Sequence, residues 1–253
     1  MLGRIVLKLR TDKERQLDYF SGSVLHGCLI ELAGRNAEYL HGGDGLRAYS
    51  QYCYYDERTG STVWQINTLN KTSSEIIAQA LQGVETIYLK QKGLEYHVAE
   101  KTGFTYITYR ELLLSQMNRE RIPRSAALYF KTPCALKFQN QSVNYPVVRS
   151  IIAGLYAKWN VFSEIVDLEQ KELVEQIAAD NRISSYSLSS RVFPLGGSKI
   201  PAFQGWLKLE SHLPVVLTAL RNALLLYGEY AGIGSKTALG LGAVETGLGS
   251  DVR

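Results

Sequence analysis

Apolar and polar positions alternate at the start of the chain and then recur at helical spacing. Ile5, Leu7 and Leu9 alternate with polar neighbours, which predicts a half-buried strand over residues 4–10. The apolar positions that follow have a period near that of a helix and predict one around residues 24–32. Two strand-like segments, a helix and a strand complete this half, over residues 46–55, 61–69, 72–81 and 84–90. The order βαββαβ is that of a ferredoxin-like domain.

The helix over residues 72–81 has its own start and stop signals. Thr72 and Glu75 have the spacing of a capping box, and Gly83 is placed to end the helix. A further hairpin, over residues 94–99 and 104–109, is expected to extend this half.

The same order of elements returns after residue 120. Strand material over residues 125–138 is interrupted at Pro133, and a helix follows over residues 147–162. A hairpin is predicted over residues 184–193 and 200–210, and an apolar helix over residues 214–225. A last strand follows the helix. The sequence therefore predicts an α+β fold of two tandem ferredoxin-like (RRM-like) βαββαβ domains, at residues 1–120 and 121–253.

Composition excludes several classes of protein. With 45% hydrophobic and 21% charged residues in 253, the chain is expected to be globular, and no apolar run approaches the roughly 18 residues of a membrane helix. The three cysteines have no CxxC spacing, which favours a reducing, cytoplasmic compartment. The four histidines have no metal-binding spacing, so neither a metal nor another cofactor is expected.

The charges are segregated along the chain, although the formal net charge is only +4. Residues 119–149 carry six basic side chains and one acidic one. Residues 181–209 carry four basic side chains and no acidic one. Six acids cluster at residues 164–180, where helical spacing predicts an inserted helix with a solvated acidic face, distant from any anionic ligand. This segregation favours a polyanionic partner, and it makes Arg191 and Lys199 candidates to contact it.

A glycine-rich run occupies residues 228–242 near the end of the chain. Five of its fifteen residues are glycines, so backbone N–H groups can approach a ligand closely. Ser235, Lys236 and Thr237 add two hydroxyls and a cation, which suits phosphate. The run is not a Walker A loop, because Ser235 precedes the lysine and the continuation over residues 239–245 alternates like a strand. A glycine-rich hairpin that only turns the chain is the structural alternative.

Together these segments resemble the CRISPR-associated endoribonuclease 6 family, whose members cut the repeat in the CRISPR precursor transcript. The resemblance rests on the two ferredoxin-like halves, the glycine loop and the strand–Thr-Pro element at residues 130–133. It implies that CRISPR repeat RNA, single-stranded or folded as a hairpin, is the substrate. Other CRISPR effector subunits are expected partners of a monomer or homodimer. The expected RNA contacts are Gly232, Gly234, Ser235, Lys236, Thr237, Gly240 and Gly242, with Arg191 and Lys199.

The resemblance also points to catalytic candidates. Residues 38–50 are similar to the family segment that carries a histidine and, a few residues on, a lysine. His41, on a glycine-flanked segment that reads as an exposed loop, is the candidate for proton transfer. Arg47 is the position most nearly equivalent to the lysine and would stabilise the phosphate. His26, on the first helix, is the alternative candidate to His41 for the catalytic histidine. A tyrosine of some members corresponds to Ile30 here, which favours a histidine-plus-cation mechanism.

The expected activity is a metal-independent cleavage by the RNA's own 2′-OH, leaving a 5′-OH and a 2′,3′-cyclic or 3′-phosphate. Two other classes stay open at this point. One is a non-catalytic RNA-binding subunit of a CRISPR ribonucleoprotein, which a cleavage assay with pure protein and repeat RNA would distinguish. The other is a small-molecule enzyme that holds a nucleotide phosphate in the glycine loop, although the strand–loop–helix context of such loops is missing.

Overall fold

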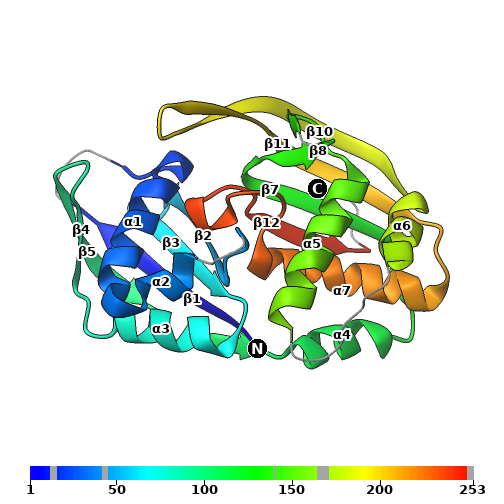
Figure 1. The fold of residues 1–253 in the computed structure, drawn as a ribbon, viewed down its shortest axis with the longest axis horizontal. Coiled ribbons are helices and arrows are strands. Elements are labelled where there is room, and N and C mark those ends of the chain that lie inside the picture. Colours follow the sequence, from blue (N-terminus) through cyan, green and yellow to red (C-terminus); the bar gives the residue numbers. More distant parts are fainter. Residues whose placement is uncertain (12–15, 42–44, 140, 164–170, 250–253) are drawn as a thin grey trace.

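Two antiparallel sheets lie side by side, each with helices against it (Figure 1). The computed structural model describes residues 1–11, 16–41, 45–139, 141–163 and 171–249. The predicted α+β class is confirmed. The division at residue 120 stays a prediction, because helix α4 (Tyr109–Met117), just before it, packs with the second half through Tyr109 and Leu112.

The first sheet has the strand order β2-β3-β1-β5-β4, and β6 pairs with the start of β1. Alternation along β1 buries Leu7 and Leu9 under the helices, as the sequence predicts. The elements of this half are β1 (Leu2–Arg10), α1 (Gly22–Ala33), α2 (Ala37–His41), β2 (Tyr49–Asp56), β3 (Ser61–Thr68), α3 (Lys71–Leu81), β4 (Thr86–Leu89), β5 (Leu94–Lys101) and β6 (Thr105–Ile107).

The pairing of β4 and β5 differs from the predicted hairpin. The strand predicted over residues 84–90 forms the edge strand β4, and β5 pairs with both β4 and β1. The predicted hairpin of residues 94–99 with 104–109 was therefore wrong. A tight turn between Leu89 and Leu94 makes β4 and β5 a hairpin instead, and β6 is left to pair with β1.

The second sheet has the order β10-β11-β7-β12, the strand order of a ferredoxin-like domain. Helices α5 and α7 bury Trp159 and Tyr227 in its core, where the two rings meet edge to face. The elements are β7 (Ser125–Cys134), β8 (Leu136–Phe138), β9 (Gln141–Val143), α5 (Val148–Phe162), α6 (Lys171–Ala179), β10 (Asn181–Leu195), β11 (Ser198–Ser211), α7 (Val215–Ala231) and β12 (Val244–Leu248).

Three local predictions needed correction. Strand β7 continues through Pro133, which lies where the pairing register with β11 shifts and residues 131–133 have no register partner on β11, so the missing N–H of proline breaks no pair. Helix α3 is capped by Asn70, whose Oδ1 accepts from the Ser73 N–H at 2.9 Å, rather than by the predicted Thr72 and Glu75. Helix α7 extends to Ala231, so the irregular part of the glycine-rich run begins at residue 232.

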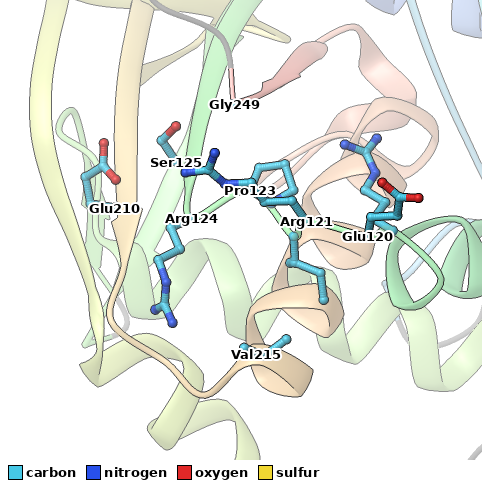
Figure 2. Close-up of a pocket in the computed structure, with 10 residues that line it drawn as sticks. Glu120, Arg121, Pro123, Arg124, Ser125, Glu210, Val215 and Gly249 are labelled. Carbon is cyan, nitrogen blue, oxygen red and sulfur yellow. The ribbon is translucent and has the colours of Figure 1, made fainter.

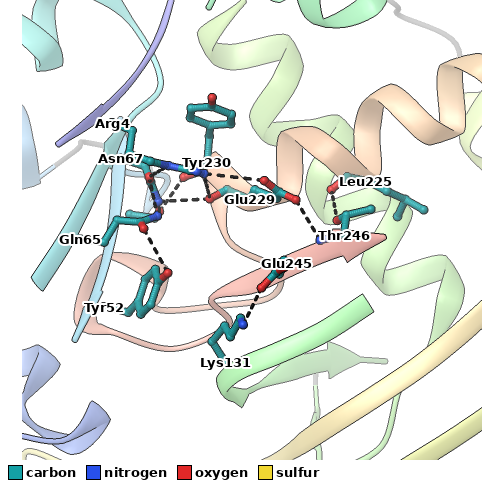
Figure 3. Close-up of polar contacts among 11 residues, drawn as sticks. Arg4, Tyr52, Gln65, Asn67, Lys131, Leu225, Glu229, Tyr230, Glu245 and Thr246 are labelled. Carbon is teal, nitrogen blue, oxygen red and sulfur yellow. Dashed lines mark hydrogen bonds and ion pairs between the residues drawn. The ribbon is translucent and has the colours of Figure 1, made fainter. Parts of the chain in front are cut away.

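The last turn of α7 joins the two halves (Figure 3). The Arg4 guanidinium on β1 lies 4.7 Å from the Tyr230 ring centroid and 3.8 Å from the Glu229 carboxylate. Asn67 Nδ2 on β3 donates to the Glu229 carbonyl at 3.2 Å, and the Thr246 N–H of β12 donates to the Glu229 carboxylate at 2.9 Å. Because the irregular part of the glycine-rich run follows this turn directly, its start is fixed relative to both sheets.

Candidate active site

A cleft of about 820 Å³ lies between the two halves. Arg47 and the end of α2 line it from the first half, and α5, the β8–β9 hairpin and the glycine-rich segment line it from the second. The structure thus brings the predicted residues His41 and Arg47 together with part of the predicted loop. Of the predicted RNA contacts in the loop, those that line the cleft are Gly234, Ser235, Lys236 and Thr237.

The glycines of the loop serve contacts within the protein. A Cβ on Gly234 would collide with the Ala135 carbonyl, and one on Gly242 with the Ile233 carbonyl. Gly240 packs against Gly22 at the start of α1. These glycines have positive φ, which L side chains rarely adopt. Gly232, Gly240 and Gly242 are buried and do not line the cleft, so the loop presents to it mainly Ser235 and the exposed Lys236.

A buried lysine that the sequence analysis did not single out holds this loop in shape. Lys158 on α5 donates through Nζ to the carbonyls of Ala231 and Gly232, at 2.8 and 3.1 Å, and to Thr237 Oγ1 at 3.2 Å. Burial lowers the pKa of Lys158 to about 8, and the nearby Cys134 opposes this shift. Only the fold shows the role, because in sequence Lys158 is one polar position on an apolar helix.

The first half fixes the loop from the other side. Gln51 Nε2 on β2 donates to the Ala238 carbonyl at 2.9 Å and to the Gly22 carbonyl at 2.6 Å. Its Oε1 accepts from the Trp64 indole N–H at 2.6 Å, so the whole buried amide is satisfied. The glycine-rich segment is therefore held between the two halves.

His26 lies beneath the cleft, and its side chain is only 8% exposed. Its Nε2 is 3.3 Å from Arg47 Nη1, and its Nδ1 is hydrogen-bonded to the hydroxyl of the buried Tyr49. Burial, followed by the charges of Arg47 and His41, lowers the pKa of His26 to about 4, so the ring is neutral at pH 7. Because arginine can only donate, Nε2 accepts and Nδ1 carries the proton, which it donates to Tyr49.

His41 ends the short helix α2, whereas the sequence analysis expected it on a loop. Its side chain is exposed and lines the cleft, and its ring lies 5.8 Å from that of His26, centroid to centroid. Arg47 Nε donates to the His41 carbonyl at 3.3 Å. Arg47 thus bridges the buried and the exposed histidine, and its charge stands at the cleft wall.

Further cations reach the cleft from the second half. Lys137 on β8 and Arg149 on α5 line it opposite Arg47. Arg149 Nε donates to Glu175 of helix α6 at 2.9 Å. The sequence analysis expected the acidic helix to lie far from any anionic ligand, and this was wrong. Because α6 packs beside α5, the helix lies close to the cationic cleft. The first acids of that predicted cluster, at residues 164–170, lie outside the described residues.

Two other predicted contacts do not line the cleft. Arg191 and Lys199 are exposed on the β10–β11 hairpin and do not line it. Arg121 and Arg124 line a separate pocket of about 750 Å³ with Glu210, Val215 and other residues around the start of β7 (Figure 2). The basic segment at residues 119–149 therefore contributes to two sites at opposite ends of β7, about 30 Å apart at the rise of a strand.

No group of three or more His, Cys, Asp and Glu side chains in the described part of the chain is placed to hold a metal ion. None of the described helices is long and apolar enough to cross a membrane. The buried Tyr49 and Lys158 are the site residues that sequence reasoning missed. The only signal of Lys158 in sequence was a charged group on a mainly apolar helix, and Tyr49, which lies between Arg47 and the polar pair Ser50 and Gln51, had no signal of its own.

Comparisons with known proteins show which proteins this chain is similar to. Residues 128–244 match the family described as CRISPR-associated endoribonuclease Cas6. A Streptococcus thermophilus protein of that name is 25% identical over 225 residues, covering 87% of this chain and 88% of the relative. One from Mycobacterium tuberculosis (strain CDC 1551 / Oshkosh) is 27% identical over 254 residues, covering 96% and 77%. A solved Cas6 product complex has the same fold, with a TM-score of 0.80 at 19% identity over 97% of this chain and 99% of that one.

Proposed function

We propose that this chain, which belongs to the CRISPR-associated endoribonuclease Cas6 family, cuts CRISPR repeat RNA in the cleft between its two halves. The chain is an endoribonuclease that processes this RNA, and repeat RNA is its partner. The observation that carries the choice of site is that the exposed His41 and the cation Arg47 face the exposed Lys236 across one cleft. A non-catalytic binding role is not favoured.

The reaction follows from the chemistry of RNA. The 2′-OH beside the scissile phosphate attacks phosphorus, so a 2′-O–P bond forms and the bond from phosphorus to the 5′-oxygen breaks. One proton leaves the 2′-OH and another is delivered to the 5′-oxygen. The products are a 2′,3′-cyclic phosphate, which can open to a 3′-phosphate, and a 5′-OH. The nucleophile belongs to the RNA, so the protein has to supply proton transfer and charge stabilisation.

Each residue of the site has a distinct role in this proposal. His41 is the proton-transfer group, since it lines the cleft and imidazole can give or take a proton near neutral pH. The Arg47 guanidinium stabilises the negative charge that builds up on the phosphate oxygens. Neutral His26 is a positioning residue, because its Nε2 accepts from Arg47 beneath the cleft wall. Lys236 and Ser235 hold the flanking phosphate, and the Lys158 contacts keep their loop in place.

We place the activity in the cytoplasm. Three cysteines, Cys28, Cys53 and Cys134, are free and buried, as expected for a reducing compartment. Burial raises the pKa of the Cys28 and Cys53 thiols to about 11 and about 12, so neither is a reactive thiolate at neutral pH.

Two substitutions test the division of labour between the histidines. His41→Ala should slow cleavage by roughly 10²–10⁴-fold with little effect on repeat binding, because a proton-transfer group acts mainly in the transition state. His26→Gln should stay within a few-fold of wild type, since the glutamine oxygen can accept from Arg47 in place of Nε2. Single-turnover cleavage of labelled repeat RNA in a chelator, with analysis of the RNA ends, measures both.

The opposite pattern would reassign the chemistry. If His26→Gln loses activity as severely as His41→Ala, His26 transfers a proton itself. If His41→Ala retains full activity, the proposed proton transfer is wrong. Cleavage by wild-type protein that stops in the chelator would contradict the metal-independent mechanism.

A further inference from the structure

A third pocket, of about 340 Å³, lies between strand β10 and the loop that leads into α5. Its apolar wall includes Phe203, which is 1% exposed, and Leu188. Tyr145 and Tyr186 line it with side chains that are 51% and 67% exposed. Large aromatic side chains left this accessible around an apolar pocket mark a binding surface.

Polar groups stand at the rim of this pocket. Asn144 Nδ2 donates to Ser190 Oγ at 3.1 Å, and Ser189 also lines the pocket. Strand β10 is the edge of its sheet, so the backbone groups on its outer side have no partner strand among the described elements. The pocket therefore combines an apolar aromatic body with hydrogen-bonding groups at its edge, which is the pattern that a nucleobase needs.

The pocket adjoins the catalytic cleft. Ser142 on β9 lines the cleft, and Asn144, two residues later, lines the pocket, so about 7 Å of extended chain separates them. Strand β9 thus forms the boundary between the two. An RNA strand that leaves the cleft past Lys137 and Arg149 would meet this pocket next.

The charge around the pocket suits an anionic partner such as RNA. Residues 181–209, which form β10 and most of β11, contain four cations and no carboxylate. None of the described residues that line the pocket is acidic. Hydroxyl groups instead occupy much of the exposed part of β10, where five serines lie between residues 184 and 190.

The position of Tyr186 is set by the close approach of two strands. Tyr186 pairs with Leu207, and next to this pair β11 has Gly205 at φ 132°. A Cβ there would collide with the Ser187 carbonyl, so only glycine permits this spacing. The backbone of β10 that carries Tyr186 is therefore held at a fixed spacing from β11.

We propose that this pocket, formed by Tyr145 and Tyr186 beside the catalytic cleft, binds one unpaired nucleobase of the substrate RNA. The base stacks on a tyrosine ring, and Asn144, Ser189 and Ser190 lie where they can bond its edge. This inference rests on the proposed function and adds a base-binding subsite to it. Stacking recognises every base, whereas the polar rim provides sequence preference.

A double-mutant cycle between protein and RNA tests the proposal. Repeat RNAs that each lack one base, at successive unpaired positions flanking the cut, are bound to wild type and to Tyr186→Ala, Tyr145→Ala and Tyr186→Phe. Tyr88→Ala is the matched control, because Tyr88 on β4 is 55% exposed and lies in the other half of the molecule. Each variant is first checked for an unchanged unfolding transition, which its exposed position leads us to expect.

For wild type we expect one abasic position that weakens binding by roughly 5- to 100-fold, the range of one base–aromatic stack. At least one Tyr→Ala variant should bind intact RNA more weakly by a similar factor. Removal of that base should then change the affinity of this variant very little. The variants Tyr186→Phe and Tyr88→Ala should bind all the RNAs as wild type does. If both Tyr→Ala variants bind every RNA as wild type does, the pocket takes no base, and a protein partner is the alternative occupant. If wild type neither binds nor cuts repeat RNA, the proposed function itself fails.

Discussion

At the residue scale, two histidines close in space have opposite environments. His26 and His41 lie 5.8 Å apart between ring centroids, yet one is buried and the other exposed. Burial and the adjacent Arg47 keep His26 neutral, so its nitrogens can serve as fixed hydrogen-bonding groups. The neutral ring orients Arg47 without adding a second positive charge beside it.

This environment predicts a pH dependence of stability. The pKa of His26 is about 4 in the folded protein against an ordinary 6.5, so between these values only the unfolded chain binds the proton. Stability from this residue is present above pH 6.5 and lost as the pH falls toward 4. We expect wild type to lose on the order of 1–2 kcal/mol through His26 between pH 7 and pH 5. Urea unfolding at the two pH values measures it.

The variant His26→Gln is the control for this prediction, because it keeps hydrogen-bonding groups but does not titrate. Its unfolding free energy should change less than that of wild type over the same pH interval. An equal change in both proteins would mean that His26 titrates alike in the folded and unfolded states.

At the element scale, the glycine loop is built by contacts with its own protein. Its glycines fit against the Ala135 and Ile233 carbonyls and the start of α1, while Lys158 and Gln51 bond its backbone from either side. The alternatives left open by the sequence, a ligand-binding loop or a glycine-rich turn, are therefore not exclusive. The glycines shape the segment, and Ser235 and Lys236 are the side chains it presents to the cleft.

Gly242→Ala should therefore act first on stability. With φ at 67° and the Ile233 carbonyl in the way, an added Cβ should lower the unfolding free energy by more than about 2 kcal/mol. Gly27→Ala is the matched control, since Gly27 lies on α1 with nothing within 4 Å of the added Cβ. That variant should be neutral or more stable by up to about 1 kcal/mol. Denaturant unfolding of both compares them, and a Gly242→Ala protein as stable as wild type would show that the loop can rearrange freely.

At the scale of the whole molecule, the two halves place cations in separate regions. Lys236, Arg47 and Arg149 surround the cleft, whereas Arg121 and Arg124 lie at the far end of β7. The predominantly basic segment at residues 119–149 is thus divided by the direction of one strand. Only the cleft combines these cations with His41.

The salt dependence of RNA binding distinguishes the two regions. Lys236→Ala should weaken binding and reduce the slope of log affinity against log salt by about 0.7–0.9, the value for one lost phosphate contact. Arg121→Ala, the same change of charge at the far pocket, should leave affinity and slope at wild-type values. Titrations of repeat RNA at four or more salt concentrations measure both, and an equal loss in the two variants would extend the RNA path beyond the cleft.

The sequence alone determined the periodic features of this protein. The alternation in β1 and the helical spacing over α5 predicted their elements correctly, because burial on one face leaves a direct record in the order of apolar residues. The repeated βαββαβ order and the glycine-rich run were sufficient to indicate the family. The position of His41 near a cation was also visible, since Arg47 is only six residues away.

The tertiary structure decided what depends on partners distant in sequence. Which strand lies beside β1 depends on competition between β4 and β5 for one sheet edge, which no local pattern records. The neutrality of His26 arises from burial next to Arg47 and Tyr49, and the role of Lys158 from carbonyls more than 70 residues away. Hydrophobic periodicity reports burial of a face, whereas hydrogen bonding and electrostatics in a site depend on distances that only the folded chain sets.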